Sequence, residues 1–199
     1  FLKALRVPLV IVGQQNETSG ATVVTVDDFA AIASAANHLL ELGHRHFAYV
    51  SVGDRTYSNQ NRRDGFAKAL ADSPYETSFT VVETSGANEL EQGPDALEKV
   101  CEAGATAAMC YNDLVAIGLL SACARRSVRV PEELSIVGFD DIAVTPYLPV
   151  PLTTIHQPGE ETGRAAVSTA LDLINGGQVR RTLLSAKLVV RGTTASPKS

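Results

Sequence analysis

The 199-residue chain contains no tryptophan, one methionine and three cysteines, and aromatic residues make up only 6% of it. The cysteines are odd in number and show no C-x-x-C spacing, so a disulfide framework is not expected and a reducing cytoplasm fits better. The four histidines complete no metal-ligand pattern with these cysteines. We therefore predict neither a metal nor a cofactor.

Several classes of sequence signal are also missing. No apolar run is long enough to cross a bilayer, and the first twelve residues lack the charged start and cleavage site of a signal peptide. The net charge of −5 argues against a nucleic-acid-binding surface on this chain. No dinucleotide-binding glycine motif, P-loop lysine or nucleophile-elbow serine is present. We therefore expect a cytoplasmic protein that has no membrane partner and is not an enzyme.

Strand-like apolar runs alternate with helix-like segments along the whole chain, which predicts an α/β fold with parallel sheets flanked by helices. Asp27 can cap the first clear helix, and Gly43 can end it. Pro94 fits the first position of a later helix. The predicted strands are 8–12, 22–26, 46–52, 79–83, 106–111, 134–137, 153–156 and 183–191, and the predicted helices are 27–42, 60–71, 94–104, 113–126 and 159–175.

Polar residues follow two of the predicted strands. Asp140 and Asp141 come after the strand 134–137, and Asn112 and Asp113 come after the strand 106–111. In a parallel sheet, ligands bind outside the carboxyl ends of strands, so these residues are expected to face a crevice. Aspartate and asparagine also cap helices and turns. We predict Asp141 as a cap and Asp140 as a ligand contact, while Asn112 fits either role. The adjacent aspartates could imitate an acid/base pair, but neighbours on a chain rarely oppose one another across a substrate.

Seven segments in order resemble the lactose/galactose repressor (LacI/GalR) family of bacterial transcription regulators, and together they span nearly the whole chain. They are Val7-Pro-Leu-Val-Ile-Val, His38-Leu-Leu-Glu-Leu-Gly-His-Arg45, Arg62 with Gly65-Phe66, Thr106 to Asp113, Val130 to Asp141, Leu152 to Gln157 and Val189-Val-Arg191. The resemblance implies a two-lobed fold like that of periplasmic sugar-binding proteins, with a ligand held between the lobes.

The resemblance also implies how the chain is divided. Residues 1–43 and 157–185 would form the N-terminal lobe, and residues 44–156 and 186–199 would form the C-terminal lobe. The family pattern begins with a helix-turn-helix, a hinge helix and two more strand–helix units. No segment of this chain resembles these parts of the pattern. At roughly 30 residues per unit, about 60 residues of the N-terminal lobe would be absent. We therefore expect the N-terminal lobe of this chain to be incomplete. We also expect the chain to be part of a longer regulator, in which a segment outside this chain binds operator DNA.

The resemblance places ligand contacts on residues Arg62, Asn112, Asp140 and Gln157. The planar guanidinium of Arg62 could hold paired hydroxyls or a carboxylate, although a surface arginine between charged neighbours is the alternative. Gln157 lies on a crossing segment, where it could touch a ligand or brace the hinge. Tyr57 and Ser58, on the expected loop before the Arg62 helix, are predicted rim contacts.

The predicted helix 113–126 is apolar almost all round. One face must cover the sheet, and another would be costly to expose, unless loops enclose it. Members of the family it resembles dimerise through this helix and the loop that corresponds to 142–148. We therefore predict a two-fold homodimer. Its predicted interface residues are Leu114, Ile117, Leu119 and Tyr147.

Together these features favour the effector-sensing domain of a transcription regulator, usually a repressor. A small polar metabolite, such as a sugar or sugar derivative, would change the angle between the lobes and so alter the fit to operator DNA. The alternative is a secreted sugar-binding protein of a transport system, and the upstream sequence would decide. A pentose, hexose, glycoside, phosphorylated sugar or purine would each fit these residue types.

Overall fold

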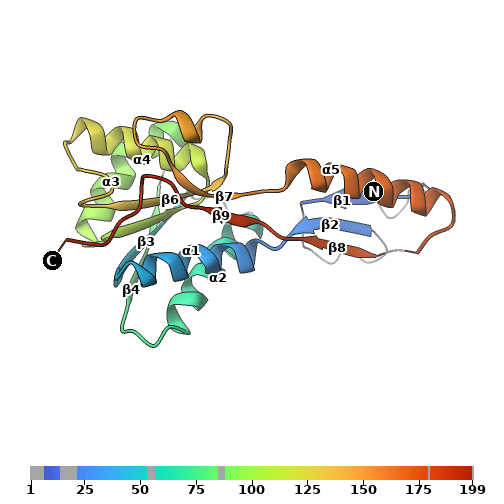
Figure 1. Ribbon diagram of the computed structural model, residues 1–199, viewed down its shortest axis with the longest axis horizontal. Coiled ribbons are helices and arrows are strands. Elements are labelled where there is room, and N and C mark those ends of the chain that lie inside the picture. The colour runs from blue at the N-terminus through green and yellow to red at the C-terminus, as the bar shows by residue number, and fades with distance from the viewer. Residues whose placement is uncertain (1–6, 14–21, 53–56, 85–87, 179, 199) are drawn as a thin grey trace.

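The computed structural model describes residues 7–13, 22–52, 57–84, 88–178 and 180–198. It has two lobes of unequal size joined by extended segments (Figure 1). The large lobe is built on a six-stranded sheet with the order β4-β3-β5-β6-β7-β9, and the small lobe on a three-stranded sheet with the order β1-β2-β8. The predicted α/β class is confirmed. No helix in the described ranges is both long enough and apolar enough to span a bilayer.

The elements alternate along the chain as expected. The strands are β1 (Val10–Val12), β2 (Thr22–Val26), β3 (His46–Ser51), β4 (Ser78–Glu83), β5 (Ala107–Cys110), β6 (Ser135–Asp140), β7 (Thr153–His156), β8 (Arg181–Leu184) and β9 (Lys187–Val189). The α-helices are α1 (Asp28–Glu41), α2 (Tyr57–Ala71), α3 (Gly93–Glu102), α4 (Asp113–Arg125) and α5 (Gly159–Ile174). The short 3-10 helices are η2 (Glu89–Gln92) and η3 (Thr145–Tyr147).

The large sheet is covered on both faces. Strands β4, β3, β5, β6 and β7 run parallel, and β9 joins β7 antiparallel at the edge. Alternate residues of β3 point to opposite faces. Ala48 and Val50 pack with α3 and α4, whereas Phe47 and Tyr49 pack with α1 and α2. This double burial explains why the central strands read as continuous apolar runs.

Helix α1 belongs to the packing of the large lobe. The side chain of Asp27 accepts a hydrogen bond from the Ala30 amide at 3.0 Å, as predicted for a cap. Ile32 is buried in the same core as Phe66 of α2. A Cβ at Gly65 would come within 2.6 Å of the Ile32 side chain, so the close approach of α1 and α2 requires glycine. We therefore propose that the first crossing between lobes lies at Asp27, not at the expected position after Gly43.

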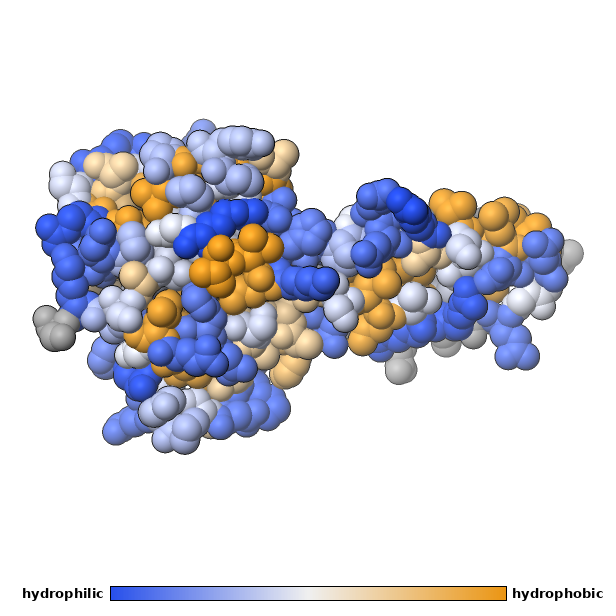
Figure 2. Space-filling view, viewed as in Figure 1, coloured by the Kyte–Doolittle hydropathy of each residue, from blue (hydrophilic) through white to orange (hydrophobic). Residues whose placement is uncertain are grey.

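In the small lobe, the helix among the described residues that covers the sheet is α5. Strands β1, β2 and β8 are parallel, and α5 contacts all three strands (Figure 1). Val167, Leu171 and Ile174 on the outer side of α5 are each more than half exposed. They lie along one stripe of the helix at spacings of four and three residues. Figure 2 shows apolar surface along this part of the small lobe.

The structure corrects two boundaries. The single strand predicted over 183–191 is wrong, because β8 ends at Leu184 in the small sheet and β9 begins at Lys187 in the large one. The chain therefore passes between the sheets at residues 185–186, as it also does after β2 and after β7 (Figure 1). Tyr57 and Ser58 are not in a loop but form the first turn of α2.

Candidate functional site

The buried side chain of Arg62 lies at the carboxyl end of the large sheet. Its Nε atom is 3.1 Å from Asp28 Oδ2. Its Nη1 atom donates to the backbone oxygen of Tyr111, just beyond β5, at 2.8 Å. The guanidinium carbon lies 3.6 Å from the centre of the Phe139 ring in β6. These contacts from α1, β5 and β6 fix the direction in which Arg62 points.

Asp140, the last residue of β6, is the second member of this cluster. Its Oδ1 atom is 3.8 Å from Arg62 Nη2, and it accepts a hydrogen bond of 2.6 Å from Gln157 Nε2. The side chain of Asp140 is 32% exposed, compared with 7% for Arg62 and 12% for Asp28. An alcohol can accept from a guanidinium and donate to a carboxylate at once. Arg62 and Asp140 therefore form a pair suited to hydroxyl groups.

Burial shapes the charges in this cluster. It raises the pKa of Asp140 and of Asp28 above their ordinary values, and the positive charge of Arg62 acts against that rise. A partly buried carboxylate is tolerated when an opposite charge compensates it. Arg62 therefore compensates the negative charge of both carboxylates, and its removal would leave both uncompensated.

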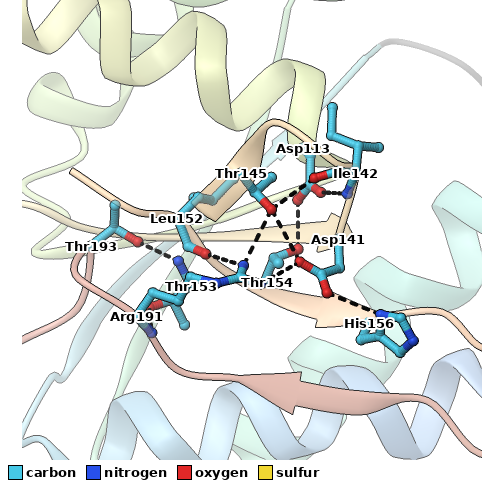
Figure 3. Close-up of polar contacts among 10 residues, drawn as sticks. All are labelled: Asp113, Asp141, Ile142, Thr145, Leu152, Thr153, Thr154, His156, Arg191 and Thr193. Atoms are coloured by element: carbon cyan, nitrogen blue, oxygen red, sulfur yellow. Dashed lines mark hydrogen bonds and ion pairs between the residues drawn. The ribbon is translucent and has the colours of Figure 1, made fainter. Parts of the chain in front are cut away.

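A second polar network surrounds Asp141 (Figure 3). Its carboxylate accepts hydrogen bonds from Arg191 Nη2 at 2.7 Å and from the Thr145 hydroxyl at 3.0 Å, and it pairs with His156 Nδ1 at 2.9 Å. Burial acts to raise the pKa of Asp141, but the hydrogen bonds from Arg191, His156 and Thr145 outweigh it and hold the pKa below its ordinary value. The prediction that Asp141 is a cap is wrong, because the N-cap of the following helix η3 is Val144 and the Asp141 carboxylate is the centre of this network.

Asp113 holds the same turn from the other side (Figure 3). It is fully buried and accepts hydrogen bonds from the Thr154 hydroxyl and from the Ile142 amide, the latter at 2.8 Å. Burial raises the pKa of Asp113 to about 6.

The backbone of the two-aspartate turn is unusual. Asp140 has φ of +112° and Asp141 has φ of +56°. Residues other than glycine rarely adopt a positive φ, and the surrounding structure must hold them in this conformation. The contacts of Asp141 with Arg191 and of Ile142 with Asp113 anchor the residues that follow Asp140. They therefore position the carboxylate of Asp140 beside Arg62.

The remaining predicted ligand residues are Asn112, Ser58 and Tyr57. Asn112 caps α4 by accepting from the Val115 amide at 3.0 Å, which confirms the capping alternative, and its side-chain amide donates to Glu89. Ser58 precedes Arg62 by four residues on α2, so both lie on one side of the helix. Tyr57 is 39% exposed at the start of that helix.

The predicted interface residues differ in exposure. Leu119 is fully buried in the core between α4 and the large sheet, so its assignment to a dimer surface is wrong. Leu114 and Tyr147 are exposed, Tyr147 to 84%. Ile117 lines a groove of about 380 Å³ with an apolar lining that includes Leu120, Leu148 and Val150.

Sequence reasoning missed several members of the site. Asp28 was not singled out because its neighbour Asp27 accounts for the helix cap. A second carboxylate directly after a cap, at the end of a crossing strand, was the available signal. Phe139 and Glu89 carried no such signal, since their contacts with Arg62 and Asn112 join residues distant in the chain.

Comparisons with known proteins identify the family of the chain. Residues 36–194 match the model of a periplasmic binding protein-like domain. A crystal structure of a LacI transcriptional regulator from a Rhodococcus species has a TM-score of 0.87 and 33% identity, and the match covers 97% of this chain and 72% of that one. The chain belongs to the LacI family of transcriptional regulators. Its match to that domain confirms the periplasmic-binding-protein-like fold.

Other LacI-family proteins are similar over nearly the whole chain. An HTH-type regulator of Streptomyces limosus is 36% identical over 95% of this chain, and the repressor CytR of Escherichia coli is 31% identical over 94%. The chain spans 55% and 56% of the length of these two relatives. These relatives are transcriptional regulators, which favours the regulator over a transport protein.

Two further LacI-family structures bear on ligands and assembly. A regulator from Enterococcus faecium with bound ribose has a TM-score of 0.85 and 28% identity, covering 96% of this chain and 72% of that one. A dimeric Lac repressor with an 11-residue C-terminal deletion has a TM-score of 0.86 and 26% identity, covering 97% and 71%.

Proposed function

We propose that this chain is the effector-sensing part of a transcription regulator and that it binds a small polyhydroxylated metabolite between its lobes. The observation that carries the proposal is the pairing of Arg62 with Asp140 where the sheet ends and the lobes join. The two side chains offer donors and an acceptor to the same hydroxyl-bearing molecule. The ribose bound to the Enterococcus faecium relative supports a sugar as ligand class.

The arrangement of the connections suggests how binding would be transmitted. Asp28 follows the crossing from β2, and Gln157 precedes the crossing into α5. A ligand held by Arg62, Asp140 and Gln157 would therefore act on two segments that lead into the small lobe. Closure about such connections is a hinge motion. In the longer regulator, we propose that this motion changes the affinity for operator DNA, by about 1–3 kcal/mol of coupling.

Ligand binding can be tested with the purified chain. We expect at least one member of a panel of monosaccharides, glycosides and nucleosides to raise its melting temperature. Arg62→Ala should abolish this response, because it removes the donors. Arg63→Ala is the matched control, because Arg63 is the next residue on α2 and pairs with its exposed neighbour Asp64.

Asp140→Asn gives a second variant that keeps the size of the side chain and removes its charge. We expect it to weaken binding of the same ligand at least tenfold, which is the loss of one charge-assisted hydrogen bond. A panel hit that binds both variants as tightly as the wild type would contradict the proposed site. In the longer regulator, both variants should still bind operator DNA but no longer respond to the ligand.

We further propose that two chains associate through α4 and the loop around η3. The apolar lining of the groove beside Ile117 and the exposure of Leu114 and Tyr147 support this surface, and the Lac repressor relative is dimeric. Tyr147→Glu should yield monomers in analytical ultracentrifugation without loss of helical signal. A dimer that persists in Tyr147→Glu and in Leu114→Glu would contradict this surface.

A further inference from the structure

Two of the five N–H donors of Arg62 bind acceptors of the chain itself. Nε is paired with Asp28, and Nη1 donates to the Tyr111 carbonyl. The Phe139 ring lies against the plane of the guanidinium. Nη2 points to Asp140 but stops at 3.8 Å, beyond a direct hydrogen bond. The edge of Arg62 that an incoming ligand would meet includes Nη2 and lies next to Asp140, because the Asp28 carboxylate already occupies the Nε side.

The side chains around this edge of Arg62 are acidic. Asp28 lies on one side of Arg62 and Asp140 on the other, so two carboxylates share one guanidinium. Glu89 adds a third carboxylate, which acts on Asp140 and accepts a hydrogen bond from Asn112. An anionic ligand at this place would meet repulsion from groups that Arg62 does not fully compensate.

We propose that Asp28 is a specificity-determining residue that neutralises Arg62 and restricts the effector to an uncharged polyol. The proposal rests on the proposed function and narrows its ligand class. A hydroxyl accepts from Nη2 and donates to Asp140, whereas an ionised phosphate or carboxylate has no proton to give Asp140. Selectivity then comes from the penalty that Asp28 and Asp140 place on the charged competitor.

The sequence context of Asp28 supports a role beyond the fold. Asp27 already caps α1, so the helix does not need a second aspartate for its first amide groups. The carboxylate of Asp28 is nevertheless buried, and burial raises its pKa. A buried charge is costly unless it is paired, and the partner of Asp28 is the side chain we place in the ligand site.

The test measures neutral and anionic forms of the same sugar on the same protein. Isothermal titration calorimetry would compare ribose with ribose 5-phosphate, and glucose with glucose 6-phosphate, on the wild-type chain. We expect the neutral member of whichever pair binds to bind more tightly. Asp28→Asn keeps the shape and an acceptor for Arg62 Nε, and it should shift the ratio of the two affinities towards the phosphate ester by about tenfold.

Asp27→Asn is the matched control, because it removes the same charge one residue away and asparagine still caps a helix. It should leave the ratio of affinities within about twofold of the wild type. Equal shifts in Asp28→Asn and Asp27→Asn would overturn the role of Asp28. Phosphate esters that bind the wild type as tightly as the parent sugars would overturn the proposal without any variant.

The outcome also separates this inference from the proposed function. Sugar binding that depends on Arg62 but does not discriminate against the ester would leave the proposed function intact and remove the inference. Absence of binding by every sugar, glycoside and nucleoside tested would contradict the proposed function and, with it, the inference.

Discussion

The two lobes are built from the same kinds of element but differ in how completely the described residues cover those elements. In the large lobe, helices lie on both faces of the sheet, and the strands between them are buried. In the small lobe, α5 contacts the three strands, and its outer stripe of Val167, Leu171 and Ile174 is exposed. We expect the large lobe to carry most of the stability of this chain.

The difference explains where the candidate site is fixed. Arg62, Asp28 and Asp140 take their positions from α2, α1 and β6, all of which belong to the large lobe. The segments that follow β2 and β7 connect this site to the small lobe. A large lobe that holds the polar groups, joined to the small lobe by extended segments, is a suitable arrangement for a ligand-driven hinge (Figure 1).

The largest contrast between the lobes should appear when a leucine is shortened in each. Leu119→Ala, in the core of the large lobe, should lower the free energy of unfolding by about 2–5 kcal/mol, since it leaves a cavity. Leu171→Ala, on the exposed stripe of α5, should change it by less than about 0.5 kcal/mol. Urea unfolding followed by circular dichroism measures both. Similar losses at the two positions would remove the contrast.

Ion pairs provide the next contrast. Arg191→Met should destabilise the large lobe by about 3 kcal/mol, because it leaves the Asp141 carboxylate without its nearest cation in a site that is mostly buried. Arg164→Met removes an exposed pair with Glu160 on α5 and should cost less than about 0.5 kcal/mol. The same unfolding experiment tests both. An Arg191→Met variant as stable as Arg164→Met would show that the Asp141 network is not needed for the turn.

The buried carboxylate of Asp113 gives a pH-dependent prediction. Its pKa in the folded chain is about 6, above the ordinary value of 3.8. The folded state therefore binds this proton more tightly than the unfolded state, and the contribution of Asp113 to stability falls as pH rises from about 4 to about 6. Asp113→Asn removes this dependence. Its stability relative to the wild type should increase by up to about 3 kcal/mol between pH 4 and pH 7.

The smallest effect concerns the boundary between the lobes. Asp27→Ala removes the cap of α1 and should cost about 1 kcal/mol. Because α1 packs on α2 and the large sheet, we expect the loss in the large lobe. Hydrogen exchange should show faster exchange in α1 and α2 and unchanged exchange in α5. Faster exchange confined to the small lobe would indicate that α1 belongs to that lobe.

Much of the fold could be predicted from the sequence because local patterns determine it. The cap at Asp27, the apolar runs of the central strands and the glycine-ended helices each have a local signature. The split between β8 and β9 was missed because both strands continue one apolar pattern, and only their pairing with β2 and β7 separates them. Pairing partners distant in the chain leave no trace in the pattern of either strand.

The site was predictable to a smaller extent. The family resemblance predicts Arg62, Asp140 and Gln157 as ligand contacts, and the structure brings these three residues together. Asp28 was missed because its role depends on the packing of α1 against α2, which joins residues that are 34 positions apart. Leu119 was placed on a surface because an apolar helix does not reveal which of its faces meets the sheet.

A crystal structure of the chain with the sugar that raises its melting temperature most would test the account directly. We predict sugar density between the lobes, with hydroxyl oxygens within hydrogen-bond distance of Arg62 Nη2 and an Asp140 carboxylate oxygen, and with Asp28 still paired with Arg62 Nε. Density for the sugar in the groove beside Ile117, or elsewhere with Arg62 and Asp140 free of it, would contradict the account.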